Sequence, residues 1–253
     1  MDFLSGRFRH ILLFNYAVEP ELLTPYLPAF TELDFHRGNC FLSLVGVQLQ
    51  DLKVYGIPFP LHRNYAQVNL RFYVRRRLGN GACRSGVVFL RQVVPHRIIA
   101  WGARRIFNEK AVRHRIDCTL REVDQQSSLV EYGWYNRQQR HFIKAAFQEQ
   151  SYFEVPAAER KFFVERHWGY CSQKDGGCLE YRFDHPPWPA YRALDASEVV
   201  SVGDFYGPPF TSVFDARPDS VFACRGSTIL LGRGLRLHQG NLNPMTALPQ
   251  QPG

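Results

Sequence analysis

Hydrophobic and polar residues alternate along much of this chain, which is the pattern of β-strands with one buried face. In residues 66–75 one face carries only apolar side chains, namely Ala66, Val68, Leu70, Phe72 and Val74. The other face carries Gln67, Asn69, Arg71, Tyr73 and Arg75. The sequence Gly79-Asn80-Gly81 predicts a hairpin turn into a partner strand at residues 85–94. The same pattern predicts strands at residues 8–16, 32–35, 40–52, 115–123, 129–137, 141–150, 177–184 and 199–202.

Helices are expected to be few and to lie outside the strands. Helical spacing of apolar residues predicts them at residues 20–27, 96–107 and 156–167. No repeat or low-complexity linker interrupts the chain, so we expect one domain over residues 1–240. The segment 241–253, NLNPMTALPQQPG, is predicted to be a disordered tail. The fold class predicted from this pattern is mainly β.

The composition agrees with many short strands joined by turns. The chain has 253 residues, of which 45% are hydrophobic and 14% aromatic, with 16 Pro and 19 Gly. No apolar run is long enough to cross a membrane as a helix, and no apolar leader with a cleavage site opens the chain. Six cysteines occur without a Cys-x-x-Cys pair, which favours a reducing compartment. We therefore expect a soluble cytoplasmic protein.

The net charge of +8 raises the possibility of an acidic partner. The densest basic segments are residues 71–77 and 113–115, and aromatic residues interleave with the first. Such a segment resembles a nucleic-acid surface, but a half-exposed strand produces the same alternation. A nucleic-acid partner is therefore the weaker hypothesis, and a small anionic ligand fits the charge equally well. The gaps within the group His167, Cys171, Cys178 and His185 are unlike those of a zinc finger, so we predict no metal and no other cofactor.

Several short blocks of this sequence resemble the YqjF-like family of uncharacterised proteins. They are residues 9–16, RHILLFNY; 67–71, QVNLR; 103–107, ARRIF; 165–168, ERHW; and 185–188, HPPW. That family is similar to the acetoacetate decarboxylases. The resemblance implies a single decarboxylase-like domain, a cone-like antiparallel β-barrel with a few peripheral helices and a small ligand cavity.

The resemblance also implies where the decarboxylase chemistry would lie. Their motif, Arg-Glu-Ile-Trp/Phe-Gly-Phe/Tyr-Pro-Lys-Lys, places its arginine at Arg104 but its two lysines at Ala111 and Val112. Neither residue can form the Schiff base on which that decarboxylation depends. Lys110 lies one residue early, and in an extended segment such a shift reverses the direction of the side chain. It is a candidate nucleophile, with a solvated surface lysine as the alternative.

Other positions of the family can be followed in the same way. The active-site glutamate falls at Gln67, which can form hydrogen bonds but cannot act as a base, and Asn69 lies on the same strand face. The arginine near the first strand falls at Arg9, for which a structural salt bridge is equally plausible. The predicted ligand-binding residues are Arg9, Gln67, Asn69 and Arg104.

Two further residues of the shared blocks can transfer protons. Glu165 and His185 are candidate catalytic groups together with Lys110, although an exposed ion pair and a rigid turn are the favoured alternatives. The function predicted from the sequence is binding or transformation of a small anionic or carbonyl ligand, without Schiff-base chemistry. The alternatives are a non-catalytic scaffold with a filled barrel and, less favoured, a nucleic-acid-binding protein. Unpaired sheet edges make a homo-oligomer the expected assembly.

Overall fold

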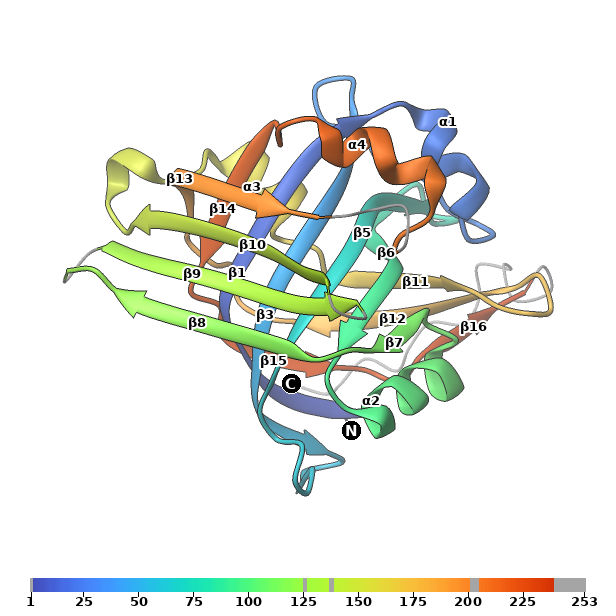
Figure 1. The fold of residues 1–253 in the computed structure, drawn as a ribbon. Helices are drawn as coiled ribbons and strands as arrows, with labels where there is room; N and C mark the ends of the chain where they lie inside the picture. The colour runs from blue at the N-terminus through green and yellow to red at the C-terminus, as the bar shows by residue number, and fades with distance from the viewer. Residues whose placement is uncertain (1, 125–126, 137–138, 201–204, 239–253) are drawn as a thin grey trace, which may run out of the picture.

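The computed structural model describes residues 2–124, 127–136, 139–200 and 205–238 (Figure 1). These residues are mainly β, with short helices at the periphery. The strands are β1 (Leu4–Val18), β2 (Glu32–Leu33), β3 (Cys40–Val54), β4 (Ile57–Pro58), β5 (Tyr65–Arg77), β6 (Cys83–Val94), β7 (Ala111–Arg113), β8 (Ile116–Glu122), β9 (Ser127–Asn136), β10 (Gln139–Gln148), β11 (Trp168–Ser172), β12 (Cys178–Asp184), β13 (Ala190–Val199), β14 (Ser220–Cys224), β15 (Thr228–Leu231) and β16 (Leu235–Leu237). The helices are α1 (Pro20–Leu23), α2 (Arg97–Gly102), α3 (Ala157–Phe163) and α4 (Thr211–Asp215), with short turns η1 (Thr24–Tyr26), η2 (Ala103–Phe107), η3 (Ser151–Phe153) and η4 (Pro208–Phe210).

The strand pairings close into a ring. The path runs β3–β5–β6–β11–β12–β15–β1, and β1 pairs with β3 again to complete it. One edge of β1 pairs with β15 through its early residues and with β14 through its later residues, and its other edge pairs with β3. Most pairings are antiparallel, whereas β6 pairs in parallel with both β7 and β11. The mainly β, antiparallel fold expected from the sequence is confirmed.

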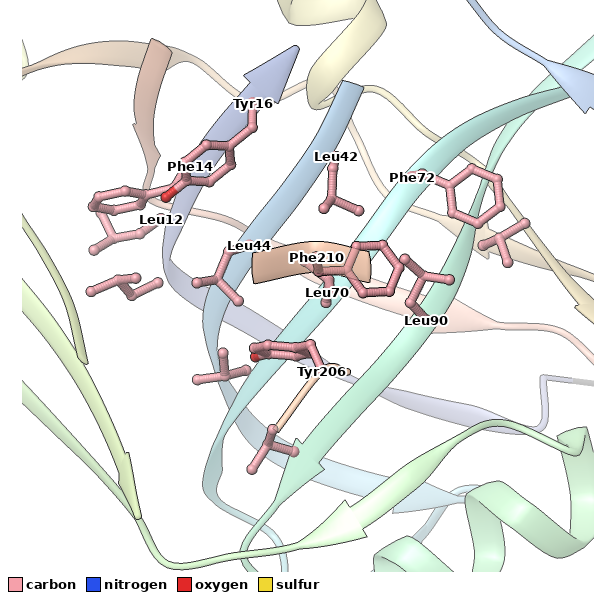
Figure 2. Close-up of a cluster of buried hydrophobic side chains, with 14 of the residues drawn as sticks. Leu12, Phe14, Tyr16, Leu42, Leu44, Leu70, Phe72, Leu90, Tyr206 and Phe210 are labelled. Carbon is pink, nitrogen blue, oxygen red and sulfur yellow. The ribbon is translucent and has the colours of Figure 1, made fainter. Parts of the chain in front are cut away.

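A second sheet continues from the ring through β14 and β13 to β10, β9 and β8. It lies across the outer face of β1, β3 and β5 (Figure 1). Between the two layers is the larger hydrophobic core, which includes Val130, Tyr132 and Trp134 of β9. Figure 2 shows that the side chains of Leu44 and Leu70 in this core lie beside Tyr206 and Phe210. The second sheet therefore covers a face of the ring that would otherwise meet water.

Strand β5 is buried on both faces. Its apolar residues, Val68, Leu70, Phe72 and Val74, belong to the core beneath the second sheet. On the inner face, Tyr73 packs with Phe162 and Phe163 of α3. The polar residues Gln67 and Asn69 are only 8% and 7% exposed. The alternation correctly predicted a strand, but its polar face lines the interior of the ring and not solvent.

The strands expected near residues 8–16, 40–52, 66–75 and 85–94 are confirmed, and each is longer than expected. The turn at Gly79 to Gly81 is also confirmed, with the Gly81 amide donating to the Leu78 carbonyl at 3.0 Å. The helix expected at 156–167 is shorter, because α3 spans only Ala157–Phe163 and the amides of Val164 and Glu165 both donate to the Arg160 carbonyl. A strand was expected at residues 199–202, but β13 (Ala190–Val199) ends at Val199 and residue 200 lies outside any strand. Residues 201–202 lie outside the described residues. The tail at 241–253 also lies outside them, and the single domain stays a prediction.

Carboxylates pair with three arginines of the basic segment of β5. Arg75 and Arg77 bind Glu32 at 2.7 and 2.8 Å, and Arg76 binds Glu180 at 3.0 Å. These ion pairs weaken the nucleic-acid hypothesis for this strand. Within the described residues, no helix is long and apolar enough to cross a membrane.

Gly226 lies between β14 and β15 against β1, and we predict that it cannot be replaced without loss of stability. Its φ is +75°, and an added Cβ would overlap the carbonyl group of Phe8. Gly81 has a similar φ of +82° but no atom within 4 Å of an added Cβ. Gly81→Ala should therefore cost about 1 kcal/mol from backbone strain, and Gly226→Ala at least about 2 kcal/mol more. Urea denaturation measures both, and equal losses would contradict the predicted clash.

Candidate functional site

A cavity of about 360 Å³ opens at the end of the ring where α2 and the N-terminus lie (Figure 1). Strands β1, β3, β5, β6, β12 and β15 contribute to its wall, and α2 and η2 border it. The wall is mainly apolar and includes Phe8, Phe59, Phe89, Trp101, Ile106 and Phe183. Such a volume and lining are typical of sites for small, largely apolar ligands.

One polar cluster interrupts this apolar wall. Gln67 donates from Nε2 to Asn69 Oδ1 at 2.6 Å and to Gln92 Oε1 at 3.1 Å. Close by, the Tyr181 hydroxyl donates to Glu109 Oε1, and Glu109 is only 4% exposed. All five residues line the cavity. A ligand in the cavity would therefore meet its hydrogen-bonding partners at one place.

The strand register brings three of these residues together. Gln67 and Asn69 are two residues apart on β5 and so share a face, and Asn69 lies opposite Gln92 in the pairing with β6. Gln92 in turn faces the start of β7, because its backbone N–H donates to the Lys110 carbonyl at 3.1 Å. The neighbouring Glu109 is thus placed beside Gln92.

A sharp backbone turn directs the chain from η2 to β7. Asn108 has a φ of +60°, in the left-handed region that asparagine tolerates better than most residues. Its side chain donates to the Ser172 carbonyl at 2.8 Å, which ties the turn to β11. After this turn Glu109 lies in the cavity wall, whereas Lys110 is exposed.

Burial raises the pKa of Glu109 to about 7. The hydrogen bond from Tyr181, the side chain of Gln92 and the nearby charge of Lys110 act in the opposite direction, but more weakly. Glu109 Oε2 is buried and has no partner of normal hydrogen-bond geometry. A carboxyl group that titrates near neutral pH and faces a cavity can donate or accept a proton.

A smaller cavity of about 60 Å³ adjoins the larger one. Phe8, Val47, Asn69, Phe89 and Phe183 line both cavities. The lining of the smaller one also includes Arg71, Arg166, His185 and Trp188. Asn69 is therefore a polar group with access to both spaces.

His185 lies in the wall of this smaller cavity. Its ring stacks on Trp188 at 4.0 Å and on His167 at 4.7 Å between ring centroids. Its Nδ1 lies 2.9 Å from the Pro186 carbonyl oxygen. Burial is the main cause that lowers its pKa, so the ring is neutral near pH 7. The described residues hold no group of three or more His, Cys, Asp or Glu side chains that could bind a metal.

The structure brings only some of the sequence-predicted residues to these cavities. Gln67 and Asn69 line the larger one, and His185 lines the smaller. Arg9 is half-buried and lines neither, and Glu165 pairs with Arg160 at 3.0 Å. Their assignment as site residues stays a prediction without support from the cavity geometry.

Arg104 and Lys110 also lie outside the lining. Arg104 is exposed and donates from Nε to the Ala100 carbonyl at 3.2 Å. Lys110 Nζ lies 5.2 Å from the centroid of the Tyr26 ring. None of the described lining residues of the larger cavity is a lysine, and the absence of Schiff-base chemistry stays a prediction.

Sequence analysis missed Glu109, Gln92 and Tyr181. Glu109 was not predicted because the motif resemblance points to its lysine positions, Ala111 and Val112, and to the adjacent Lys110. The sequence did contain a signal for Glu109. In an extended segment, the side chain that precedes an exposed lysine points to the opposite side, towards the interior. Tyr181 is distant in sequence, and its contact with Glu109 depends on the pairing of β11 with β12.

Comparison with known families shows to which family this chain belongs. A family model, DUF2071, described as an uncharacterised conserved protein, matches residues 5–228. The chain belongs to the DUF2071 family. A relative, the uncharacterised protein YqjF of Bacillus subtilis, is 27% identical over 99 residues, which is 39% of either chain. The YqjF-like resemblance expected from the sequence is confirmed.

Solved structures show that this DUF2071 chain has the fold of acetoacetate decarboxylases. The decarboxylase from Legionella pneumophila matches with a TM-score of 0.65 and 13% identity over 93% of this chain and 87% of that one. A decarboxylase-like enzyme from Sphingomonas wittichii matches with a TM-score of 0.65 and 12% identity over 94% of each chain. The enduracididine biosynthesis enzyme MppR complexed with pyruvate has a TM-score of 0.63 and 10% identity over 95% of this chain and 93% of that one. At these identities the likeness concerns the fold.

The raised pKa of Glu109 predicts a specific dependence of stability on pH. The folded protein holds this proton up to a pKa of about 7, against 4.5 for an ordinary glutamate. Its stabilising effect is complete below about pH 4.5 and is lost as the pH rises through about 7. Relative to Glu109→Gln, the wild type should lose about 3 kcal/mol of unfolding free energy between about pH 4 and pH 8.

Urea denaturation at a series of pH values measures this difference. Glu165→Gln is the control, because Glu165 is paired with Arg160 and lies outside both cavities. Parallel pH profiles for the wild type and Glu109→Gln would rule out a raised pKa at Glu109.

Proposed function

We propose that the larger cavity binds a small, mainly apolar ligand with a carbonyl or hydroxyl group at the polar cluster. The observation that carries this proposal is a cavity of about 360 Å³ whose hydrogen-bonding groups are gathered at one place. Gln67, Gln92 and Asn69 offer neutral amides, and Glu109 offers a carboxyl group. An open cavity also favours ligand binding over a barrel filled by side chains.

The cluster favours a carbonyl or hydroxyl group over a charged one. No lysine or arginine is among the described lining residues of the larger cavity. A carboxylate placed beside Glu109 would repel it once Glu109 is ionised. A neutral oxygen can instead accept a hydrogen bond from protonated Glu109 or from an amide.

A second candidate function is proton transfer next to the ligand carbonyl. The specific observation is that the pKa of Glu109 is about 7, close to the pH at which a base works most effectively. As a carboxylate, Glu109 would take a proton from the carbon beside the carbonyl, and the amides would stabilise the developing enolate oxygen. The step needs neither a Schiff base nor a metal.

The comparisons support a ligand site of this kind through the fold alone. MppR, with the same fold, was solved with pyruvate bound. The carbonyl character of that ligand is a property of MppR, and it comes to this chain only as part of our proposal. A cytoplasmic location and a homo-oligomer remain predictions from the sequence.

A larger side chain at the cavity mouth should weaken ligand binding. Ala103 lines the cavity at the start of η2, whereas the adjacent Arg104 is exposed and outside the lining. Ala103→Phe should weaken binding of methyl hexyl ketone about tenfold or more, because the larger ring occupies the space of the ligand. Isothermal titration calorimetry measures the affinity. Arg104→Phe is the matched control and should leave it unchanged, and equal effects of the two substitutions would contradict a site at this mouth.

Proton transfer by Glu109 should appear as deuterium exchange into a bound ketone. In deuterium oxide, the wild type should exchange the protons beside the carbonyl of methyl hexyl ketone, with a rate that rises as Glu109 ionises through about pH 7. Glu109→Gln should slow this exchange about 100-fold or more. Proton NMR follows the reaction, and Glu165→Gln is the control. Exchange that persists in Glu109→Gln would exclude Glu109 as the base.

A further inference from the structure

Arg71 differs from the other arginines of β5. Arg75, Arg76 and Arg77 each bind a carboxylate, as described above. Among the described residues, no carboxylate lies within ion-pair distance of Arg71. Yet Arg71 is the arginine of this strand that lines an internal cavity. A guanidinium without a counterion in such a place is energetically costly.

The hydrogen bonding of Arg71 is incomplete. Its Nη2 donates to the Phe163 carbonyl at 2.9 Å, and its guanidinium lies 5.6 Å from the centroid of the Tyr73 ring. Its Nε is buried and has no hydrogen-bond partner. A buried donor without an acceptor costs about 1–3 kcal/mol, so an acceptor in the cavity would be favoured.

The other groups around the smaller cavity leave the charge of Arg71 uncompensated. Arg166 binds Asp34 at 2.6 Å and also donates to the Phe162 carbonyl. The pKa of His185 is lowered, mainly by burial, so this ring adds no charge near neutral pH. The net result is a cationic space next to the apolar one.

The smaller cavity has room for an anionic group of a few atoms. Its volume of about 60 Å³ exceeds what one water requires, but it is too small for the apolar body of a ligand. Asn69 borders both cavities and accepts from Gln67 through Oδ1, which leaves its Nδ2 hydrogens as donors. A carboxylate suits this combination, because two oxygens can bind a guanidinium and an amide together.

We propose that the smaller cavity is a carboxylate subsite formed by Arg71 and Asn69. The ligand is then an amphipathic monocarboxylic acid, whose carboxylate binds Arg71 and whose apolar body occupies the larger cavity. This inference rests on the proposed function, because it extends the same ligand into the neighbouring space. It also assigns the cationic role to Arg71, where the sequence had suggested Arg9.

Two probes of equal chain length separate the subsite from the main cavity. Octanoate carries the carboxylate, and methyl hexyl ketone does not. At about pH 6, where Glu109 is largely protonated, the wild type should bind octanoate about tenfold more tightly than the ketone. Arg71→Met should weaken octanoate binding about tenfold or more and leave the affinity for the ketone within about twofold of the wild type. Arg71→Lys should retain part of the higher affinity for octanoate.

Matched controls keep this test specific. Arg75→Met removes an arginine from the same strand that is paired with Glu32, and Arg9→Met removes the alternative cation. Both should leave octanoate binding unchanged. Ketone binding by Arg71→Met shows that this variant is folded and that its larger cavity is intact.

The outcomes distinguish the two proposals. If the wild type binds the ketone but gains nothing with octanoate, water fills the smaller cavity and the subsite is refuted while the larger site stands. A loss of octanoate binding in Arg9→Met and not in Arg71→Met would also refute the subsite. If neither probe binds the wild type, the proposed function fails and the subsite fails with it.

Discussion

Burial of both faces of β5 is the constraint on which the rest of this structure depends. The second sheet covers one face, and the interior of the ring receives the other. Polar side chains on the inner face have little access to water, so each needs a partner within the protein or from a ligand. Gln67 and Asn69 satisfy each other in part, whereas Arg71 keeps an unpaired Nε. At the candidate site, therefore, the hydrogen bonding of the buried polar side chains is incomplete.

Elsewhere the protein itself supplies the partners of a buried carboxylate. Glu180 is 1% exposed and receives Arg76 at 3.0 Å, Arg84 at 2.6 Å and the Tyr170 hydroxyl at 3.0 Å. Two cations and a hydroxyl thus meet on one carboxylate and link β5, β6 and β11 to β12, although Arg76 Nε has no partner. Both oxygens of Glu180 thus accept hydrogen bonds from the protein, whereas the cavity-facing Glu109 Oε2 and Arg71 Nε have no partner.

The sequence predicted the strands well and the site only in part. Period-two alternation located β5 and its hairpin partner β6, and the family resemblance directed attention to Gln67 and Asn69. What the pattern could not show is that the polar face of β5 is also buried, because the ring that encloses it closes through β11, β12, β15 and β1, which are far apart in the chain. Arg71 was therefore taken for part of a half-exposed basic strand. Tyr181 could not be predicted, since only tertiary pairing places it beside Glu109.

The left-handed turn at Asn108 determines which side chains of the following segment point into the cavity. Of two adjacent residues, Glu109 enters the cavity and Lys110 lies outside. A shift of this segment by one residue would exchange their positions, because consecutive side chains of extended backbone point in opposite directions. The cavity would then hold an amine where it now holds an acid. The register of one short loop thus decides whether the cavity wall carries a carboxyl group, which can exchange a proton, or an amine, which can attack a carbonyl.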